Sequence, residues 1–245
     1  DLIVMGKMVK REAVLFDLDN TLYDYEAPHK KALAAAFSEL KKTIKISKVK
    51  FNYLFKISKA EIKRELSGTA SAHNRVLYFQ RLIEKTHNTV NPTIILKLYD
   101  AYWNSFLKNV KPFRETLRTL KEIKKKGLGI AIVSDMTTHI QLKKLKKLGI
   151  SKYVDFLITS EESGSEKPNS IMFLLALNKL KTSPDGAIMV GDNTVADIEG
   201  ANSVGLFSVL IKKGPLAKKH KEDYQKPNAT IKKISEVLSI LDELE

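Results

Sequence analysis

Short, uniformly apolar segments alternate with amphipathic segments along most of this chain. The first apolar segment, Val14-Leu15-Phe16, is followed at once by Asp17. Four later segments share its pattern: 129–133, 156–159, 187–190 and 207–211. Strands that are apolar on both faces are typical of parallel sheets covered by helices on both sides. These five segments therefore predict a buried parallel sheet.

Helical periodicity fills the intervals between the predicted strands. The segments expected to form helices are 116–126, 140–148, 169–180, 194–204 and 231–244. Glycine follows three of them, at Gly127, Gly149 and Gly205, as it commonly does at helix C-termini. Strands and helices that alternate at this spacing predict βαβ units. We therefore expect a doubly wound, Rossmann-like α/β fold with a mostly parallel sheet of five or more strands.

The pattern changes between the first and second predicted strands. From residue 24 to 108, apolar residues recur at helical spacing with almost no strand signal, which predicts about four helices. Because the strand–helix alternation resumes afterwards, we expect an all-helical cap domain (24–108) inserted into a discontinuous α/β core (11–23 and 109–245). Pro28 and Pro112 lie near the two expected joints.

Composition limits the available chemistry. The chain has 245 residues, 43% of them hydrophobic, which is enough for a core and a smaller inserted domain. It has no cysteine, so disulfides, thiolate zinc sites and a cysteine nucleophile are excluded. Residues 1–7 are too few and too mixed for a signal peptide, and no apolar run reaches the ~20 residues of a membrane span. We expect a cytoplasmic protein without a membrane partner.

The formal net charge is +14. Such a charge has two interpretations: a footprint for nucleic acid or an anionic substrate, or a lysine-rich surface without a specific partner. The lysines are scattered over the predicted helices, and no nucleic-acid-binding motif accompanies them. A lysine-rich surface is therefore the favoured interpretation, and nucleic acid is not the expected partner.

Polar residues suited to phosphoryl transfer follow three of the predicted strands. Asp17 follows the first strand, Ser134 the second and Asp192 the fourth, while Lys167 precedes a predicted helix. Because ligands gather at the carboxyl ends of parallel strands, we expect these four side chains to converge on one pocket. An ionised carboxylate such as Asp17 can attack phosphorus and divide hydrolysis into two easier steps.

The other residue types fit the same chemistry. A divalent cation offsets the repulsion between a carboxylate and a phosphate, and Mg²⁺ prefers hard oxygen ligands such as Asp17 and Asp192. Lys167 supplies a fixed positive charge for the phosphate oxygens, and the hydroxyls of Ser134 and Thr21 can donate hydrogen bonds to them.

Asp19 lies two residues after the expected nucleophile. There it can protonate the leaving alcohol and later deprotonate the attacking water. Each feature alone has a simpler explanation: a turn for the Asp17–Asp19 pair, a helix N-cap for Ser134, and a strand-ending turn for Asp192. All of them together, in this order and each at the end of its element, favour a single catalytic site.

Four segments in this order resemble the motifs of the haloacid dehalogenase-like (HAD) hydrolase superfamily, in its subfamily I branch with a helical cap after the first strand. These segments are 16–22, 132–135, 160–168 and 190–201. The resemblance implies a magnesium-dependent phosphatase, a phosphoric monoester hydrolase that forms an aspartyl-phosphate. Family dehalogenases lack the second aspartate of the first motif, so Asp19 favours a phosphatase.

The resemblance also implies a role for each motif residue. Asp17 would be the nucleophile and a metal ligand, and Asp19 the general acid/base with its backbone carbonyl on the metal. Asp192 would be the third protein ligand of Mg²⁺. Asn193 and Asp197 would lie beside these ligands without touching the metal, with Asp197 holding Lys167.

Asp135 departs from the family pattern, which often has asparagine there. We count it with Thr21, Ser134 and Lys167 in the phosphate-binding set, but expect its side chain to point away from phosphate or to bind backbone N–H groups. Four polar residues of the expected cap could reach substrate but are expected at the solvated surface: His29, His73, Asn74 and Arg75. The sequence does not single out any of them.

The expected substrate is a small phosphorylated metabolite: a sugar phosphate, a nucleotide or a phosphoglycolate-like acid. A phosphomutase or phosphotransferase with the same intermediate remains an alternative, as does a nonenzymatic protein that binds partners through its basic surface. The expected assembly is a monomer or a homodimer.

Overall fold

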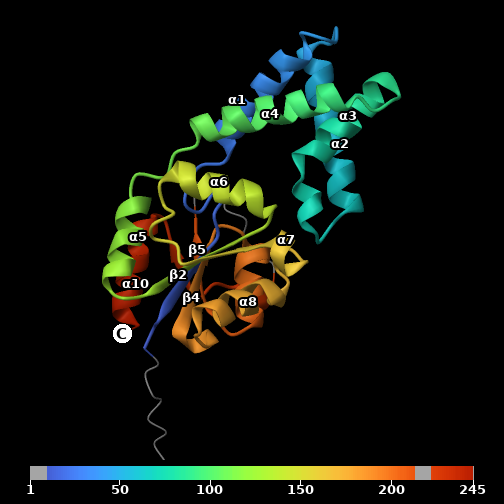
Figure 1. The fold of residues 1–245 in the computed structure, drawn as a ribbon. Coiled ribbons are helices and arrows are strands. Elements are labelled where there is room, and N and C mark those ends of the chain that lie inside the picture. The colour runs from blue at the N-terminus through green and yellow to red at the C-terminus, as the bar shows by residue number, and fades with distance from the viewer. Residues whose placement is uncertain (1–9, 213–221, 245) are drawn as a thin grey trace, which may run out of the picture.

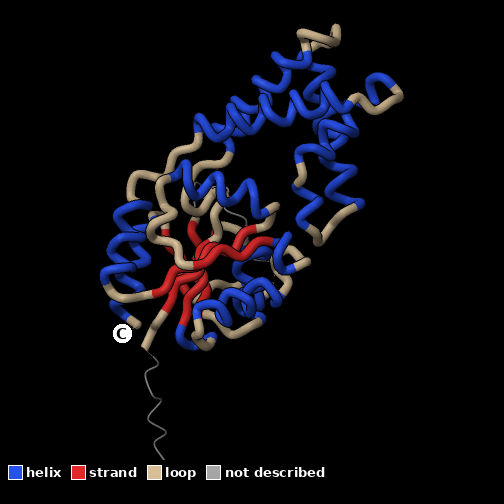
Figure 2. Tube along the Cα trace, in the orientation of Figure 1, coloured by secondary structure: helices blue, strands red, loops and turns tan. Residues whose placement is uncertain are grey.

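Six parallel strands form the centre of the protein. The computed structural model describes residues 10–212 and 222–244, so the N-terminal segment 1–7 lies outside the described residues. The strands are β1 (Ala13–Phe16), β2 (Gly129–Ser134), β3 (Phe156–Thr159), β4 (Ala187–Gly191), β5 (Phe207–Ile211) and β6 (Ala229–Ile231). Their order in the sheet is β3-β2-β1-β4-β5-β6 (Figures 1 and 2). The predicted doubly wound α/β fold is confirmed.

Strand β1 lies at the point where the strand order reverses. Phe16 of β1 pairs with Ile132 on one side and with Val190 on the other, so three strands end almost level. In open α/β sheets, such a reversal point is where ligands bind, beyond the carboxyl ends of the strands. The register thus brings residues that are far apart in sequence to one edge.

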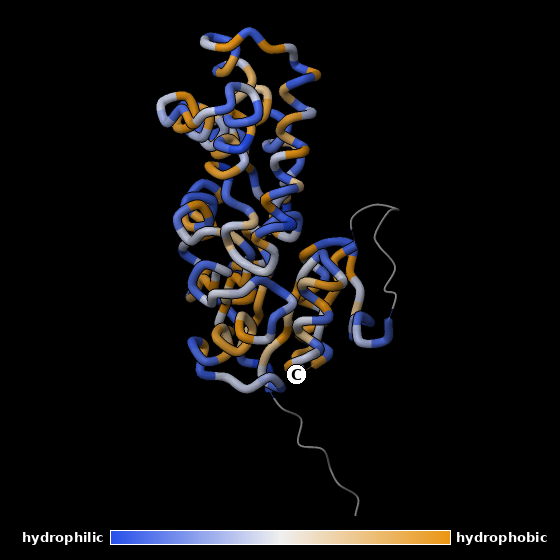
Figure 3. Tube along the Cα trace, turned by 90° about the vertical axis from the view of Figure 1, so that its right-hand side faces the viewer, coloured by the Kyte–Doolittle hydropathy of each residue, from blue (hydrophilic) through white to orange (hydrophobic). Residues whose placement is uncertain are grey.

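Helices cover both faces of the sheet. They are α5 (Thr116–Lys125), α6 (Thr138–Leu148), α7 (Ser160–Ser163), α8 (Ser170–Leu180), α9 (Gly200–Ser203) and α10 (Val237–Glu243). Alternate residues of β1 enter two separate cores: Val14 and Phe16 pack in the core that holds α5, α6 and α10, and Leu15 packs with Phe173 of α8 in the other. The apolar strands gather inside the core, while the helices mix both residue types (Figure 3).

Four longer helices lie between β1 and β2. They are α1 (Glu26–Leu40), α2 (Lys48–Glu65), α3 (Arg75–His87) and α4 (Pro92–Asn109), and a 3₁₀ turn, Ala70–His73, precedes α3. We call residues 26–109 the helical insertion; it stands above the carboxyl edge of the sheet (Figure 1). Ser47, Asn74 and Asn91 cap α2, α3 and α4 with their side chains, as these residue types commonly do. The division into two domains at 24–108 stays a prediction.

Two predicted helices differ from the structure. The segment 194–204 forms a π-helical turn, Thr194–Glu199, before α9, and the Asp197 side chain in this turn accepts a hydrogen bond from the backbone N–H of Asn193. The predicted terminal helix 231–244 is shorter: Ile231 pairs with β5 as the end of β6, a 3₁₀ turn covers Ile234–Glu236, and α10 begins at Val237. A strand of three residues is too short to give a periodic signal. In the described ranges, no helix has the length and apolarity that a bilayer crossing requires.

Phe106 at the end of α4 joins the insertion to the core. It is fully buried, and its ring centre lies 5.2–6.3 Å from those of Tyr23, Tyr25, Tyr102 and Trp103. Tyr23 and Tyr25 belong to the loop that follows β1. This aromatic cluster therefore fixes where the insertion leaves the sheet.

Replacing Phe106 by alanine should remove the centre of this cluster. We expect Phe106→Ala to lower the free energy of unfolding by about 3–5 kcal/mol, because the cavity left behind cannot fully close. Urea denaturation measures the loss. Leu96→Ala, on the exposed side of the same helix, should change stability by less than about 0.5 kcal/mol. Equal effects for the two variants would contradict this account.

Candidate active site

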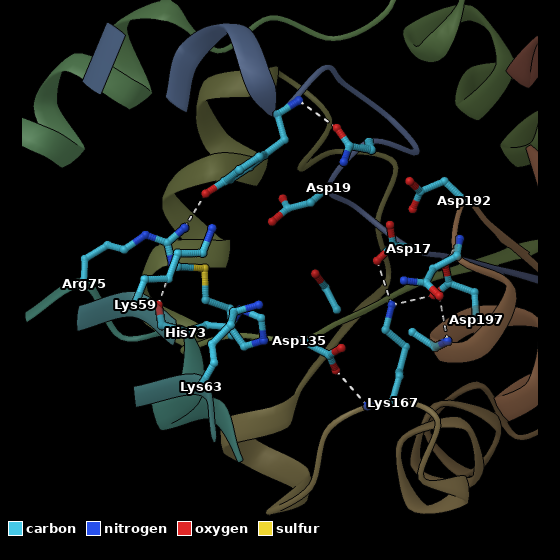
Figure 4. Close-up of a pocket in the computed structure, with 16 residues that line it drawn as sticks. Asp17, Asp19, Lys59, Lys63, His73, Arg75, Asp135, Lys167, Asp192 and Asp197 are labelled. Atoms are coloured by element: carbon cyan, nitrogen blue, oxygen red, sulfur yellow. Dashed lines mark hydrogen bonds and ion pairs between the residues drawn. The ribbon is translucent and has the colours of Figure 1, made fainter. Parts of the chain in front are cut away.

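A cavity of about 270 Å³ opens where the carboxyl edge of the sheet meets the helical insertion (Figure 4). Its volume is close to the lower end of small-molecule sites, roughly 300–1,000 Å³. The core contributes the lining residues Asp17, Asp19, Asn20, Ser134, Asp135, Met136, Lys167, Asp192, Asn193, Ala196 and Asp197. The remaining lining residues, Tyr25, Lys59, Lys63, His73 and Arg75, come from the segment between β1 and β2.

Lys167 holds two carboxylates together at the floor of the cavity. Its Nζ lies 2.7 Å from Asp17 Oδ1, 2.7 Å from Asp197 Oδ1 and 2.9 Å from the carbonyl oxygen of Val133. All three charged side chains are buried. The sequence-based expectation that Lys167 and Asp17 share one pocket is met, because these charged atoms are in direct contact.

This arrangement leaves one more negative than positive charge among the three groups. Burial raises the pKa of Asp17 to about 7, although Lys167 acts in the opposite direction. Burial raises the pKa of Asp197 as well, again against Lys167. One ammonium cannot fully compensate two desolvated carboxylates, so the site favours an additional proton or cation.

Asp19 is held by a different lysine. Lys144 Nζ of α6 lies 2.8 Å from both carboxylate oxygens, and the Tyr23 hydroxyl donates to Oδ1. Burial alone would raise the pKa of Asp19, but Lys144, the Tyr23 hydroxyl and the charge of Arg75 together lower it. The lysines of the predicted helices, Lys144 among them, were expected to form a lysine-rich surface. For Lys144 that was wrong, because it is fully buried.

The three other predicted phosphate-binding residues occupy different positions. Ser134 lines the cavity, and its Oγ accepts a hydrogen bond from Gln141 Nε2 at 2.6 Å. Thr21 is fully buried; its hydroxyl donates to Asp17 Oδ2 at 2.9 Å, and it does not line the cavity. Asp135 accepts a hydrogen bond from the backbone N–H of Lys167 at 2.9 Å, as one of the two expected orientations required.

The oxygens of Asp17, Asp192 and Asp197 offer a suitable place for a hard cation. One carboxylate oxygen of each lies within 4.8 Å of the others. Gly191 permits this approach, because a Cβ there would lie 2.3 Å from Asp197 Cγ. Asn193 points its side chain at backbone N–H groups of the following turn, and its own N–H donates to Asp197. Mg²⁺ prefers oxygen ligands, and these carboxylates carry more negative charge than Lys167 compensates. The three side chains therefore fit a Mg²⁺ ion.

The insertion places two of the four polar residues considered from the sequence in the cavity. Arg75 and His73 line it, and Arg75 is buried, so its expected surface position was wrong. His29 packs instead against Tyr102 in the aromatic cluster, where burial lowers its pKa to about 3. Asn74 caps α3. His73 Nε2 also lies 2.8 Å from Glu166 of the core.

Sequence reasoning missed Lys59 and Lys63, which lie one turn apart on α2 and line the cavity. Their spacing of four residues puts them on one helix face, but it does not say which face meets the core. For Lys144 a signal was available. It lies four residues after Ile140 and four before Leu148, on the apolar stripe of α6.

Removing the counter-ion of Asp19 should destabilise the protein. We expect Lys144→Met to lower the free energy of unfolding by about 3 kcal/mol or more, because it leaves a partly buried carboxylate without its partner. Urea denaturation at neutral pH measures the loss. Lys143→Met changes an exposed neighbour and should stay within about 0.5 kcal/mol of the wild type. A loss below about 1 kcal/mol in Lys144→Met would contradict the assigned ion pair.

Because the pKa of Asp17 is raised, the free energy of unfolding should depend on pH when EDTA keeps the site free of metal ions. Between the ordinary pKa of about 3.9 and the folded value of about 7, the folded protein binds more protons at Asp17 than the unfolded chain. The stability due to Asp17 should therefore be present at pH 4 and fall as the pH rises through about 7. Asp17→Asn should lack this slope. A wild-type minus variant difference in unfolding free energy that stays constant or rises with pH would refute the assignment.

Known proteins resemble this chain over most of its length. The sequence profile of the haloacid dehalogenase-like hydrolases matches residues 14–211. Ribulose-1,5-bisphosphate 5-phosphatase of Halopiger xanaduensis is 43% identical over 199 residues, which cover 81% of this chain and 83% of the relative. Glyceraldehyde 3-phosphate phosphatase of Methanopyrus kandleri is 28% identical over 236 residues, which cover 95% and 98%.

Solved structures share the fold. A HAD phosphatase from Thermococcus onnurineus has a TM-score of 0.73 at 26% identity, covering 94% of this chain and 97% of that one. A 2-haloacid dehalogenase from Pseudomonas syringae has a TM-score of 0.75 at 25% identity, covering 96% and 100%. The four motifs, the fold and these similarities agree: the chain belongs to the haloacid dehalogenase-like hydrolases.

Proposed function

We propose that this chain is a magnesium-dependent phosphatase that hydrolyses small phosphate monoesters through a phosphorylated Asp17. One observation carries the proposal: the Asp17 carboxylate lines the cavity at the end of the central strand, in contact with Lys167. The relatives named as phosphatases of ribulose bisphosphate and glyceraldehyde phosphate support the same activity. We infer a cytoplasmic enzyme, active as a monomer or homodimer.

Asp17, Asp192 and the backbone carbonyl of Asp19 are the proposed ligands of Mg²⁺. When bound, the ion neutralises charge on the transferring phosphoryl group and reduces its repulsion from the carboxylates. The two carboxylates that contact Lys167 carry one more charge than its ammonium compensates, and a bound cation would balance it. Asp197 and Asn193 would keep Lys167 and the Asp192 turn in position.

The first step forms a bond between an Asp17 carboxylate oxygen and phosphorus and breaks the bond from phosphorus to the ester oxygen. Lys167 and the Ser134 hydroxyl hold the phosphate oxygens, which carry the developing charge. Asp19 transfers a proton to the leaving alcohol. In the second step Asp19 takes a proton from water, the water oxygen binds phosphorus, and the Asp17–phosphorus bond breaks to release inorganic phosphate.

Asp19 must change its protonation state between these steps. The ion pair with Lys144 keeps it ionised, which suits the base of the second step. As an acid it must first bind a proton. An incoming phosphate dianion favours this, because a nearby negative charge raises the pKa of a carboxyl group.

A phosphomutase or phosphotransferase would use the same phosphorylated aspartate. The products separate these activities: hydrolysis releases inorganic phosphate, whereas transfer leaves it esterified to another hydroxyl. A screen of metabolite phosphates with a phosphate assay, followed by chromatography of the products, makes the distinction.

Substituting the two aspartates of the first motif should have different consequences. Asp17→Asn should reduce turnover by about 10⁴-fold or more, because it removes the nucleophile. Asp19→Asn should reduce kcat by about 10²–10⁴-fold. With p-nitrophenyl phosphate, whose leaving group needs no proton, Asp19→Asn should release a burst of nitrophenolate and accumulate phosphorylated Asp17, detectable by mass spectrometry.

Asp24→Asn, an exposed aspartate in the same loop, serves as the matched control and should retain wild-type rates. EDTA should abolish wild-type turnover, and Mg²⁺ should restore it. Full activity in EDTA or in Asp17→Asn would exclude the proposed mechanism.

A further inference from the structure

The cavity has two walls of opposite charge. Aspartates dominate the wall formed by the core, whereas Lys59, Lys63 and Arg75 of the insertion lie on the opposite side (Figure 4). We call these three residues the cationic wall. None of them takes part in the proposed chemistry at Asp17, so their presence in the cavity needs its own explanation.

Arg75 is a buried cation with no carboxylate in direct contact, although its charge acts on Asp19 from a longer distance. Its side chain donates to the carbonyl oxygen of His73 at 2.6 Å and to the Tyr25 hydroxyl, and it packs against the rings of Tyr78 and Trp103. Within the described part of the chain, no carboxylate lies within 4.0 Å of the guanidinium, and its Nε has no hydrogen-bond partner. A buried charge without a counter-ion is costly unless a ligand compensates it.

Lys59 and Lys63 extend this positive charge along α2. Among residues 10–212 and 222–244, no carboxylate pairs with either ammonium within 4.0 Å. Lys59 is half-buried and Lys63 is exposed. Desolvation and the charge of Arg75 lower the pKa of both lysines, whereas Glu26 acts on Lys59, and Glu166 and Asp135 act on Lys63, in the opposite direction. The positive charges of Arg75 and the two lysines repel one another across the cavity. An anion bound between them would relieve this repulsion.

The acidic residues of the same helix are engaged elsewhere. Glu61 pairs with Arg81 at 3.1 Å and with Lys85 at 2.9 Å, and Glu65 pairs with Arg81 at 2.9 Å. Both partners belong to α3. Helix α2 thus pairs its glutamates with α3, and of its lysines, Lys59 and Lys63 line the cavity without a carboxylate at ion-pair distance in the described residues.

We infer that the substrate carries a second anionic group, which the cationic wall binds while the first phosphate meets Asp17. The inference rests on the proposed phosphatase activity and assigns its substrate class: a small phosphate ester with a further phosphate or carboxylate at its other end. Three cations match a phosphate dianion best, so a sugar bisphosphate is the favoured form. The cavity of about 270 Å³ suits a metabolite of this size.

Matched substrate pairs test this directly. One pair is a pentulose 1,5-bisphosphate and the corresponding 5-monophosphate; the other is 2-phosphoglycolate and 2-hydroxyethyl phosphate. The ratio of the two kcat/KM values within a pair measures how much the second anionic group improves the reaction. The wild type should favour the anionic member of at least one pair by about tenfold or more, as expected for a charged hydrogen bond. The preferred pair identifies the second group as phosphate or carboxylate.

Lys59→Gln and Lys63→Gln should each lower that ratio by about tenfold, mainly through KM. Arg75→Lys should lower the ratio less than Arg75→Gln does, because lysine keeps the positive charge but lacks the planar geometry of the guanidinium. Lys50→Gln, an exposed lysine at the start of the same helix and outside the cavity, should leave the ratio unchanged. Ratios that stay at the wild-type value in both Lys59→Gln and Lys63→Gln would overturn the inference.

Binding separates this inference from the proposed function. Titration calorimetry with Asp17→Asn and Mg²⁺ should give a lower Kd for the bisphosphate than for the monophosphate, and Lys63→Gln in that background should remove the difference. Equal Kd values would refute the second anion site, even if p-nitrophenyl phosphate is hydrolysed. Loss of all magnesium-dependent phosphate release, with the Kd difference intact, would refute the phosphatase and retain the anion site.

Discussion

The contact of one buried lysine with two buried carboxylates controls the rest of the site. Lys167 lies between Asp17 and Asp197, with charged atoms 2.7 Å apart in both pairs. Without Lys167, two desolvated carboxylates would face each other, which is far more costly than leaving either in water. With it, one negative charge remains uncompensated and the pKa of Asp17 is raised to about 7. Asp17, the proposed nucleophile, becomes fully ionised when a cation or another positive charge binds beside it.

The fold brings these groups together by register more than by local sequence. Lys167 also binds the carbonyl of Val133 in β2, so its ammonium joins the ends of β1 and β2 to the turn after β4. The parallel pairing places those ends side by side, and Gly191 leaves the space that Asp197 needs. A shift of one strand by a single residue would separate the charges, so the packing of the sheet and the balance of the site depend on each other.

Strong hydrophobic periodicity and the order of the four motifs allowed correct predictions from the sequence. All five expected strands formed, and Asp17, Asp192 and Lys167 line one cavity. Prediction from the sequence failed for charged residues whose role depends on whether the fold buries them. Lys144 lies in a lysine-rich stretch whose other members face solvent, and only its phase with Ile140 distinguishes it. Arg75 follows a helix cap and carries no periodic signal, so its burial arises from the tertiary packing of the insertion.

The net charge of +14 is therefore too coarse a quantity to identify a partner. Surface charges are screened over a Debye length of about 8 Å at physiological salt, whereas buried charges are screened far less. Lys59, Lys63 and Arg75 are a small share of the cations, and only Arg75 of the three is buried, but all three line one cavity together with the aspartates. The contact of Glu166 with His73 and with the backbone of Gly68 brings the insertion against the core at this place. Selection of an anionic substrate would then follow from where these few cations lie, and a uniform surface of the same total charge could not provide it.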